Sequence, residues 1–365
     1  MPMAGSWKTG ATPLEPGVTP FVTIVTATLN RRTLLERALA SAVREGLEDV
    51  QHVVVDGGSS DGTLELLAAY PHLEIVCEPD RNLYDAWNKG IARARGEFIL
   101  LLNSDDELAP GALAEARRMA ALYPDADMLS GVVSLAHGQD GASDETVIID
   151  DPRMVALREQ DVGPGVPLTN GRFLRRRFVN ALGGFDVRYR VLADRQFFLR
   201  ALIAGAVNVT TDKLIYRYHV HGGSLTLNDN APAVAHAEEA LRVTVDGMAE
   251  AVSPPTRAAY RRWHAWAAFY LAGLQSRQGR LSAALATSVS ALGRDPLAPF
   301  RLVPQLIRHV AERQARKGRP HGQALRQVPV STGRAAVEAD GPPRSLGDSP
   351  GPADAAKRAG RIIGK

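Results

Sequence analysis

The sequence predicts a doubly wound α/β domain with a mostly parallel sheet, on three observations. Short apolar runs alternate with segments of helical character through the first half of the 365-residue chain, which is the pattern of strands joined by crossover helices. The runs are largely apolar, as expected for strands that helices cover on both faces. Polar residues follow each run, as at the carboxyl edge of a parallel sheet, where ligands bind.

Four strands are expected at residues 21–27, 52–55, 73–77 and 98–102, with helices at 33–44, 61–70 and 82–95 between them. The polar residues that follow the strands are, in order, Asn30, then Asp56, then Glu78 and Asp80, and last Asn103, Asp105 and Asp106. Because the carboxyl ends of parallel strands meet at one edge of a sheet, these clusters are expected to form one site.

The first cluster lies in residues 53–63, where a strand ends at Asp56, a glycine pair makes a turn, and Ser60 or Asp61 begins a helix. No Lys follows the second glycine, so this is not a phosphate loop of the Walker type. An acid at a strand end can accept hydrogen bonds from a nucleotide base or a ribose, or it can cap the amides of a tight turn. Spacing alone leaves both roles open.

The second cluster, residues 101–107, places acids where a buried strand emerges. Carboxylate oxygens suit Mg²⁺ or Mn²⁺, which take one or two protein carboxylates and leave positions for water and substrate phosphate. Side chains alternate along a strand, so Asn103 and Asp105 share a face and Asp106 points away unless the chain turns. Asp105 is therefore the expected ligand, with a solvated acidic loop before the helix near Pro110 as the alternative.

The third cluster, residues 80–90, is a helix start with many polar groups. Arg81, Asp85 and Asn88 fall on one helix face at spacings of four and three, an arrangement that could hold a diphosphate. A surface ion pair between Arg81 and Asp85 is the alternative.

Together these segments resemble glycosyltransferase family 2, which has the GT-A fold; the matching pieces are residues 25–30, 54–63, 83–90 and 101–106, within a resembling region of about 20–225. The resemblance implies a nucleotide-sugar donor bound across the first half of the sheet. It implies that Asp56 contacts the nucleotide base and that the donor is also bound by Thr26, Ala27, Asn30, Arg81, Asp85, Asn88, Asn103 and Ser104.

The family's Asp-x-Asp motif, which holds a divalent metal on the donor diphosphate, has Asn103 at its first position here. One formal negative charge is thus missing, and some polysaccharide-assembling relatives are similar in this respect. The resemblance implies Mn²⁺ or Mg²⁺ as cofactor, with Asp105, Asp106 and His221 as metal ligands.

Further along the chain, the segment 183–198 contains the acid that the resemblance identifies as the catalytic base, Asp194. Inverting transfer is a single displacement in which a carboxylate takes the proton of the attacking acceptor hydroxyl. A helix N-cap is the alternative role for Asp194. Just upstream, residues 169–173 lack the His-Gln pair that relatives often carry. The three arginines at 175–177 are expected to form a solvated helix face rather than to contact an acceptor phosphate.

The expected activity is inverting transfer of a sugar to a saccharide or lipid-linked acceptor in bacterial surface polysaccharide synthesis. A catalytically silent nucleotide-sugar-binding or scaffolding module is the alternative, and Asn103 with the missing His-Gln pair supports it. A nucleotidyltransferase is disfavoured, because residues 26–32 lack the glycine-rich first loop of that class.

Four parts are expected along the chain: a flexible N-terminal segment 1–19, the GT-A domain 20–230, a helical extension 231–317, and a disordered basic tail 318–365. Helices are expected at 233–251, 256–278 and 281–292. Residues 299–316 should form a basic amphipathic helix that either packs on this helical hairpin or lies on the cytoplasmic membrane face. From residue 318 on, 14 of 48 residues are Gly or Pro and none is aromatic, which disfavours a folded core.

Composition sets limits on the class of protein. The chain is 45% hydrophobic and 23% charged, as in soluble globular proteins, and its longest apolar runs, 98–102 and 265–274, fall short of the roughly 18 residues of a membrane span. The start does not resemble a signal peptide, and Cys77 is the only cysteine. We therefore expect a cytoplasmic protein with no disulfide framework and no nucleic-acid partner. It is expected to associate with the membrane only if the amphipathic helix binds lipid.

Overall fold

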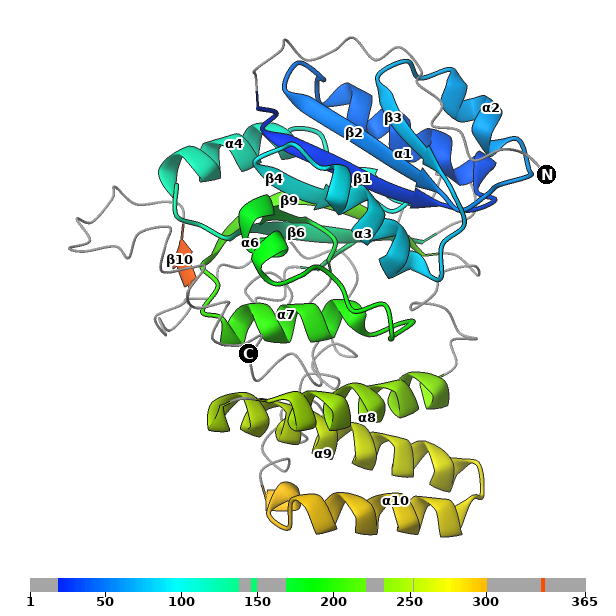
Figure 1. Ribbon diagram of the computed structural model, residues 1–365, viewed down its shortest axis with the longest axis vertical. Coiled ribbons are helices and arrows are strands. Elements are labelled where there is room, and N and C mark those ends of the chain that lie inside the picture. Colours follow the sequence, from blue (N-terminus) through cyan, green and yellow to red (C-terminus); the bar gives the residue numbers. More distant parts are fainter. Residues whose placement is uncertain are drawn as a thin grey trace. The chain divides into compact units, whose positions relative to one another are not determined.

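The computed structural model describes residues 19–137, 146–149, 169–220, 233–251, 253–300 and 336–338. The chain divides into two units, one comprising residues 1–231 with 336–365 and the other residues 232–335. The described strands belong to the first unit and helices α8, α9 and α10 to the second (Figure 1).

The first unit is built on one sheet, in which the strands follow the order β10-β9-β6-β8-β4-β1-β2-β3, with β5 paired to β9 and β7 to β6 (Figure 1). The strands are β1 (Val22–Thr28), β2 (Val50–Asp56), β3 (Leu73–Cys77), β4 (Phe98–Leu101), β5 (Glu107–Leu108), β6 (Met128–His137), β7 (Thr146–Ile149), β8 (Arg172–Arg175), β9 (Asn208–Val220) and β10 (Ala336–Glu338). Strands β4, β1, β2 and β3 are mutually parallel. Strand β8 runs antiparallel to both β4 and β6, so the sheet is mixed.

The helices of this unit are α1 (Arg32–Arg44), α2 (Thr63–Ala68), α3 (Leu83–Arg93), α4 (Ala112–Leu122), α6 (Arg176–Ala181) and α7 (Ala193–Ile203). The four strands and three helices expected in the first half are confirmed, with shifted ends. Helix α2 begins at Thr63 rather than at Asp61, because Gly62 has a left-handed φ of 89° and Asp61 accepts a hydrogen bond from Thr63 N. Asn82 caps α3 through its side chain, which accepts from Asp85 N.

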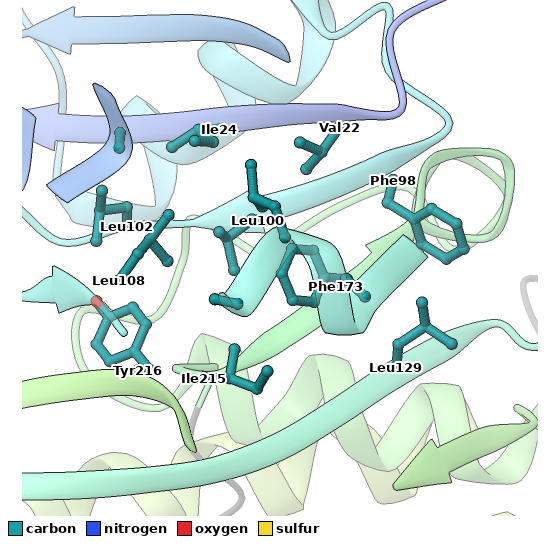
Figure 2. Packing of buried hydrophobic residues seen from close by; sticks show 14 of the residues in the cluster. Val22, Ile24, Phe98, Leu100, Leu102, Leu108, Leu129, Phe173, Ile215 and Tyr216 are labelled. Atoms are coloured by element: carbon teal, nitrogen blue, oxygen red, sulfur yellow. The ribbon is translucent and has the colours of Figure 1, made fainter. Parts of the chain in front are cut away.

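Helices cover both faces of the parallel strands, as a doubly wound fold requires. Ile24 belongs to a buried cluster with Ala38 and Ala42 of α1, whereas its neighbour Val25 lies against Gly90 of α3. Successive residues of a strand point to opposite faces, so α1 and α3 lie on opposite sides of β1. Figure 2 shows part of this cluster, in which the labelled Tyr216 of β9 lies beside Leu102 and Leu108.

Close packing of α3 on β1 requires a glycine at position 90. A Cβ on Gly90 would lie 2.3 Å from Val25 Cγ1, and overpacking of this kind costs about 1–3 kcal/mol. We expect Gly90→Ala to lower the free energy of unfolding by about 1 kcal/mol or more in urea denaturation, despite the better helix propensity of Ala. Gly273→Ala is the control, because nothing lies within 4 Å of that Cβ position; equal stabilities of the two variants would contradict the tight contact.

The second unit contains α8 (Ala233–Glu250), α9 (Pro254–Arg277) and α10 (Leu281–Arg294). Ser253 caps α9 by accepting a hydrogen bond from Thr256 N, and Gly279, with φ 76°, makes the turn into α10. Helix α9 is tied to α8 by the Thr244–His264 hydrogen bond and to α10 by the Thr287–Gln275 hydrogen bond. The three helices expected here are thus present.

Several expected features lie partly outside the described residues. These include the first 18 residues of the flexible start, most of the amphipathic helix at 299–316, and the tail apart from Ala336–Glu338. Those three tail residues form β10, which pairs in parallel with β9. Among the helices that the structure describes, none is sufficiently long and apolar to span a membrane.

Candidate active site

Asp56, at the carboxyl end of β2, is fully buried and organises the turn that follows it. Its Oδ1 accepts hydrogen bonds from Gly58 N at 2.9 Å and Ser59 N at 2.8 Å, and its Oδ2 accepts one from Ser59 Oγ at 2.6 Å. The turn-capping role that the sequence left open is therefore present. Contact with a nucleotide base would use the remaining lone-pair capacity of the carboxylate.

Asn30 joins the loop after β1 to the loop after β2. Its Oδ1 accepts from Ser60 N and its backbone N donates to Ser59 Oγ, both at 2.8 Å. Its φ is 52°, a left-handed conformation that Asn tolerates better than most residues. The side chain of Thr26 is buried and hydrogen-bonded to His52 Nε2 at 3.0 Å, and Ala27 is also buried, so a donor pocket here would be lined mainly by the exposed Asn30.

Asp80 belongs to the same edge, although it was not among the expected donor-binding residues. A Cβ on Gly57 would lie 2.8 Å from Asp80 Oδ2, so this carboxylate lies directly against the Asp56 turn. Partial burial raises its pKa, while Lys89 lowers it and Asp85 and Asp56 raise it. The signal was present in the sequence, because Asp80 follows the third strand by three residues.

The helix start at Arg81 contains the ion pair that was the alternative to a diphosphate site. Arg81 donates to Asp85 from its backbone N at 3.0 Å and from Nη2 at 2.7 Å, and Lys89 Nζ lies 3.7 Å from Asp85 Oδ2. The Arg81 side chain is 68% exposed, so it can still reach a diphosphate.

Asn88 does not fit a role in diphosphate binding. Its Nδ2 donates to Phe185 O at 2.7 Å and its Oδ1 accepts from Phe185 N at 2.9 Å. Both polar atoms of the amide are thus used to tie α3 to the Gly183–Gly184 turn. The helical spacing placed Asn88 on the face of Arg81 and Asp85, but it could not show that a distant segment occupies the amide.

Asp106, in the loop between β4 and β5, does not fit a role as metal ligand, because it is completely buried and protein groups donate four hydrogen bonds to its two oxygens. Its Oδ1 accepts from His219 N at 2.9 Å. Its Oδ2 accepts from Tyr216 Oη at 2.9 Å, Asn103 Nδ2 at 3.0 Å and Asn170 Nδ2 at 3.2 Å. Burial and the neighbouring Asp105 raise the pKa of the Asp106 carboxyl, while the hydrogen bonds from His219 N, Asn103 and Tyr216 lower it.

Asp105 has different surroundings from Asp106, but not for the expected reason: the chain turns at residues 104–105, and Asn103 lies against Asp106 rather than sharing a face with Asp105. The Asp105 side chain is 19% exposed, and its Oδ2 lies 3.9 Å from Arg31 Nη1 of the loop before α1. Arg37 Nη2 donates to the Asp105 carbonyl at 2.9 Å, which fixes the loop to α1. Ser104 is buried. Glu107, the first residue of β5, is hydrogen-bonded to Arg44 Nη2 at 3.0 Å and to His219 Nε2 at 2.9 Å.

The side chains of the β4–β5 loop fit a divalent metal whose other ligands are the oxygens of a bound diphosphate. No group of three His, Cys, Asp or Glu side chains positioned for a metal occurs among the described residues, and Asp105 is the accessible carboxylate of the β4–β5 loop. Mg²⁺ and Mn²⁺ are commonly held by one or two carboxylates together with substrate phosphates. His221, the third expected ligand, lies outside the described residues.

Asp194 is the second residue of α7 and is tied to α3. Its Oδ1 accepts from Arg195 N at 2.7 Å and lies 3.2 Å from Tyr84 Oη, which shares its one proton with Val191 O at 2.6 Å. The N-cap of α7 is Leu192, so Asp194 is not the capping residue. Within the described part of the chain, its Oδ2 accepts no hydrogen bond. Burial raises the pKa of the Asp194 carboxyl, opposed by Arg195 and Tyr84.

The three arginines at the start of α6, residues 175–177, differ from the expected solvated helix face. Arg175 is buried, pairs with Glu97 and donates to Ala126 O and Pro124 O. Arg176 Nε donates to Gly96 O at 2.7 Å, and Arg177 alone of the three is exposed. The expectation was wrong for Arg175 and Arg176, because a run of charges in a sequence does not show which backbone carbonyls lie within reach.

The mixed sheet and the helices that cover it define the fold of a GT-A transferase. The model of the family "Glycosyl transferase family 2" matches residues 23–152. The PGL/p-HBAD biosynthesis glycosyltransferase of Mycobacterium bovis (strain BCG / Pasteur 1173P2) is 30% identical over 190 residues, which cover 50% of this chain and 69% of the relative. The chain belongs to glycosyl transferase family 2.

Two further similarities extend over most of the chain. The succinoglycan biosynthesis protein ExoO of Rhizobium meliloti (strain 1021) is 29% identical over 338 residues, covering 86% of this chain and 92% of that protein. Residues 1–349 of S. aureus TarS, in a structure with UDP-GlcNAc, align with a TM-score of 0.54 and 17% identity over 76% of this chain and 81% of that one. The structural likeness supports the GT-A fold.

Proposed function

We propose that the protein transfers a sugar, with inversion, from a nucleotide-sugar donor to a saccharide or lipid-linked acceptor in bacterial surface polysaccharide synthesis. The carrying observation is Asp194, whose Oδ1 is fixed by Arg195 N and Tyr84 while Oδ2 accepts no hydrogen bond from the described residues. The names of the relatives support the proposal: one is a glycosyltransferase of PGL/p-HBAD biosynthesis and another acts in succinoglycan biosynthesis.

In this proposal the acceptor hydroxyl attacks the anomeric carbon and Asp194 accepts its proton. A raised pKa makes the carboxylate a stronger base than an ordinary Asp. The hydroxyl of Tyr84 on α3 connects Asp194, the catalytic base, to the donor half of the domain. That half contains Asn30, Asp56, Asp80 and Arg81. These residues bind and orient the nucleotide, so that the sugar is presented to the acceptor side.

Asp105 would hold the divalent metal, Mn²⁺ or Mg²⁺, with His221 as a further candidate ligand. The metal would stabilise the negative charge of the departing nucleoside diphosphate. Arg31, at 3.9 Å from Asp105 Oδ2, supplies a second positive charge on the same side of the loop.

We further propose that the protein works in the cytoplasm, in contact with the membrane face when its acceptor is lipid-linked. Exposed apolar residues on α10, among them Leu281, Leu285 and Val289 at 67%, 67% and 59% exposure, support such a contact. In a vesicle sedimentation assay, release of the protein from anionic vesicles at high salt would support an electrostatic contribution to membrane binding.

A silent nucleotide-sugar-binding module remains the second candidate, favoured by Asn103 in place of an acid and by the complete use of Asp106 inside the protein. One experiment separates the two. Nucleotide sugars are screened for thermal stabilisation with and without Mn²⁺, since a ligand of the folded state raises Tm, and each stabilising sugar is then assayed for transfer. Stabilisation without transfer to any acceptor tested would favour the silent module.

The nucleotide pocket gives a further prediction. Asp56→Ala should weaken donor binding by roughly 1.5–3 kcal/mol, the range for a hydrogen bond to a charged group, measured by calorimetry. Ser59→Ala is the matched control, since it removes the 2.6 Å bond within the turn but keeps the carboxylate. A folded Asp56→Ala variant with wild-type donor affinity would reduce Asp56 to a turn residue.

A further inference from the structure

The β4–β5 loop is fixed by buried hydrogen bonds in which Asn103 takes part twice. Its side-chain Nδ2 donates to Asp106 Oδ2 at 3.0 Å, and its backbone N donates to Tyr216 Oη at 3.0 Å. The same Tyr216 hydroxyl donates to Asp106 Oδ2 at 2.9 Å. Asn103, Tyr216 and Asp106 therefore form a closed triangle that spans the loop from its second residue to its last.

The remaining bonds of Asp106 reach two other strands. Asn170, just before β8, donates to Oδ2 at 3.2 Å, and His219 N of β9 donates to Oδ1 at 2.9 Å. Asp106 and Tyr216 have no exposed surface, and Asn170 is 7% exposed. Asp105 lies within this fixed loop, so the position of its carboxylate depends on bonds that it does not make itself.

An Asp at position 103 would disturb this arrangement. Its carboxylate would replace the Nδ2 donor 3.0 Å from the buried Asp106 Oδ2 and would face a second carboxylate there. A carboxylate at 103 has no N–H to donate, so Asp106 Oδ2 would lose one of its three donors and would face another oxygen in a buried site, which is costly. An acid at 103 therefore conflicts with the hydrogen bonding of the buried Asp106.

We propose that Asn103 is a positioning residue whose amide is required by buried Asp106, and that Asp106, Tyr216 and Asn170 hold the loop that carries Asp105. The role toward the donor depends on the proposed function. The chain departs from a two-acid motif because the first position stabilises the loop, and the accessible negative charge at this site comes from Asp105.

A double-mutant cycle on the full chain tests the pairing of positions 103 and 106. Asn103→Asp should lower Tm by about 5 °C or more, the scale of leaving a buried polar group without its hydrogen-bond partner in a protein of this size. The exchanged pair Asn103→Asp with Asp106→Asn restores one carboxylate and one amide, so its Tm loss should be well below the sum of the two single losses. Additive losses would overturn the pairing.

Binding of Mn²⁺ with UDP or GDP as probes tests the role of position 103 at the site. If Asn103 is a lost metal ligand, then Asn103→Asp should bind the Mn²⁺–nucleotide more tightly than the wild type with an unchanged Tm. The proposal expects equal or weaker binding by calorimetry. Tighter binding in a variant as stable as the wild type would overturn it.

Tyr216→Phe keeps the test decisive if Asn103→Asp does not fold, since it removes only the hydroxyl. We expect a folded variant, by circular dichroism, whose Mn²⁺-dependent nucleotide affinity falls several-fold while its metal-independent affinity stays near that of the wild type. Tyr70→Phe is the control, because Tyr70 lies beside the Leu35–Leu39 cluster, away from the loop. Wild-type Mn²⁺-dependent affinity in Tyr216→Phe would leave the triangle a purely structural feature.

Failure of the proposed function gives a different result from failure of this inference. A wild type that binds neither UDP nor GDP with Mn²⁺ contradicts the proposed function, yet the Tm cycle still measures the coupling of 103 with 106. A wild type that binds the nucleotide, combined with additive Tm losses, contradicts only the inference.

Discussion

Asp194→Asn should leave the fold and the donor affinity intact and lower sugar transfer by about 10²-fold or more, the usual scale of general-base catalysis. The change is nearly isosteric, and the amide oxygen can still accept the bonds of Arg195 N and Tyr84 Oη that hold Oδ1. What is lost is the ability to take a proton from the acceptor hydroxyl. Donor titration and a transfer assay on one preparation measure both quantities.

Two comparisons make this result specific to Asp194. Asp212→Asn is the same chemical change at an exposed residue of β9, with a side chain 76% exposed, and should transfer at the wild-type rate. Tyr84→Phe keeps the ring that packs on Phe185 but removes the hydroxyl, so it should lower transfer less than Asp194→Asn does. Near wild-type transfer by Asp194→Asn would assign the base to another residue.

The raised pKa of Asp194 also gives a sign for the pH dependence of the wild type. A base acts when it is deprotonated, and burial raises the pKa of the Asp194 carboxyl above the ordinary Asp value. Transfer should therefore fall as the pH is lowered through a value above the ordinary Asp pKa, with kcat/KM as the measured quantity. A limb at or below the ordinary Asp value would show that this carboxyl is not the titrating base.

The sequence predicted those parts of the site that depend on strand order. Asp56, Asp80 and Asp105 lie after the second, third and fourth strands, and parallel pairing of β4, β1, β2 and β3 brings these strand ends to one edge. Alternation correctly set Asp105 apart from Asp106 but wrongly grouped Asn103 with Asp105, because the chain turns at residues 104–105 and brings Asn103 to Asp106. The local sequence pattern is sufficient to predict where a residue lies when its position depends only on its own strand or helix.

Roles that depend on distant partners could not be predicted in this way. Asn88 is bonded to Phe185, 97 positions away, and Asp106 to Tyr216, 110 positions away. Each residue has the polarity of a ligand-binding group, and the fold uses that polarity internally. The same applies to Arg175, whose guanidinium binds carbonyls of residues 124 and 126.

Asp105→Asn should remove most turnover and weaken Mn²⁺-dependent donor binding by at least about 10-fold, with little change in Tm. Replacing groups that merely orient a metal ligand costs roughly 10–100-fold in metal affinity or activity, so loss of a direct charged ligand should cost no less. Stability should change little, because the side chain is partly exposed and its Arg31 partner lies 3.9 Å away. Calorimetric donor titrations with and without Mn²⁺ measure the effect.

Asp106→Asn should show the reverse pattern, and the pair of variants therefore separates a ligand from the residue that holds its loop. Three donors converge on Asp106 Oδ2 and His219 N donates to Oδ1; an Asn can place its oxygen on only one side, so its NH2 group faces a donor on the other, and Tm should fall clearly. Turnover should fall less than in Asp105→Asn, because the metal-facing carboxylate is still present. If wild-type donor affinity is the same with and without Mn²⁺, the metal assignment to Asp105 is wrong, and the loop then serves the donor without a cation.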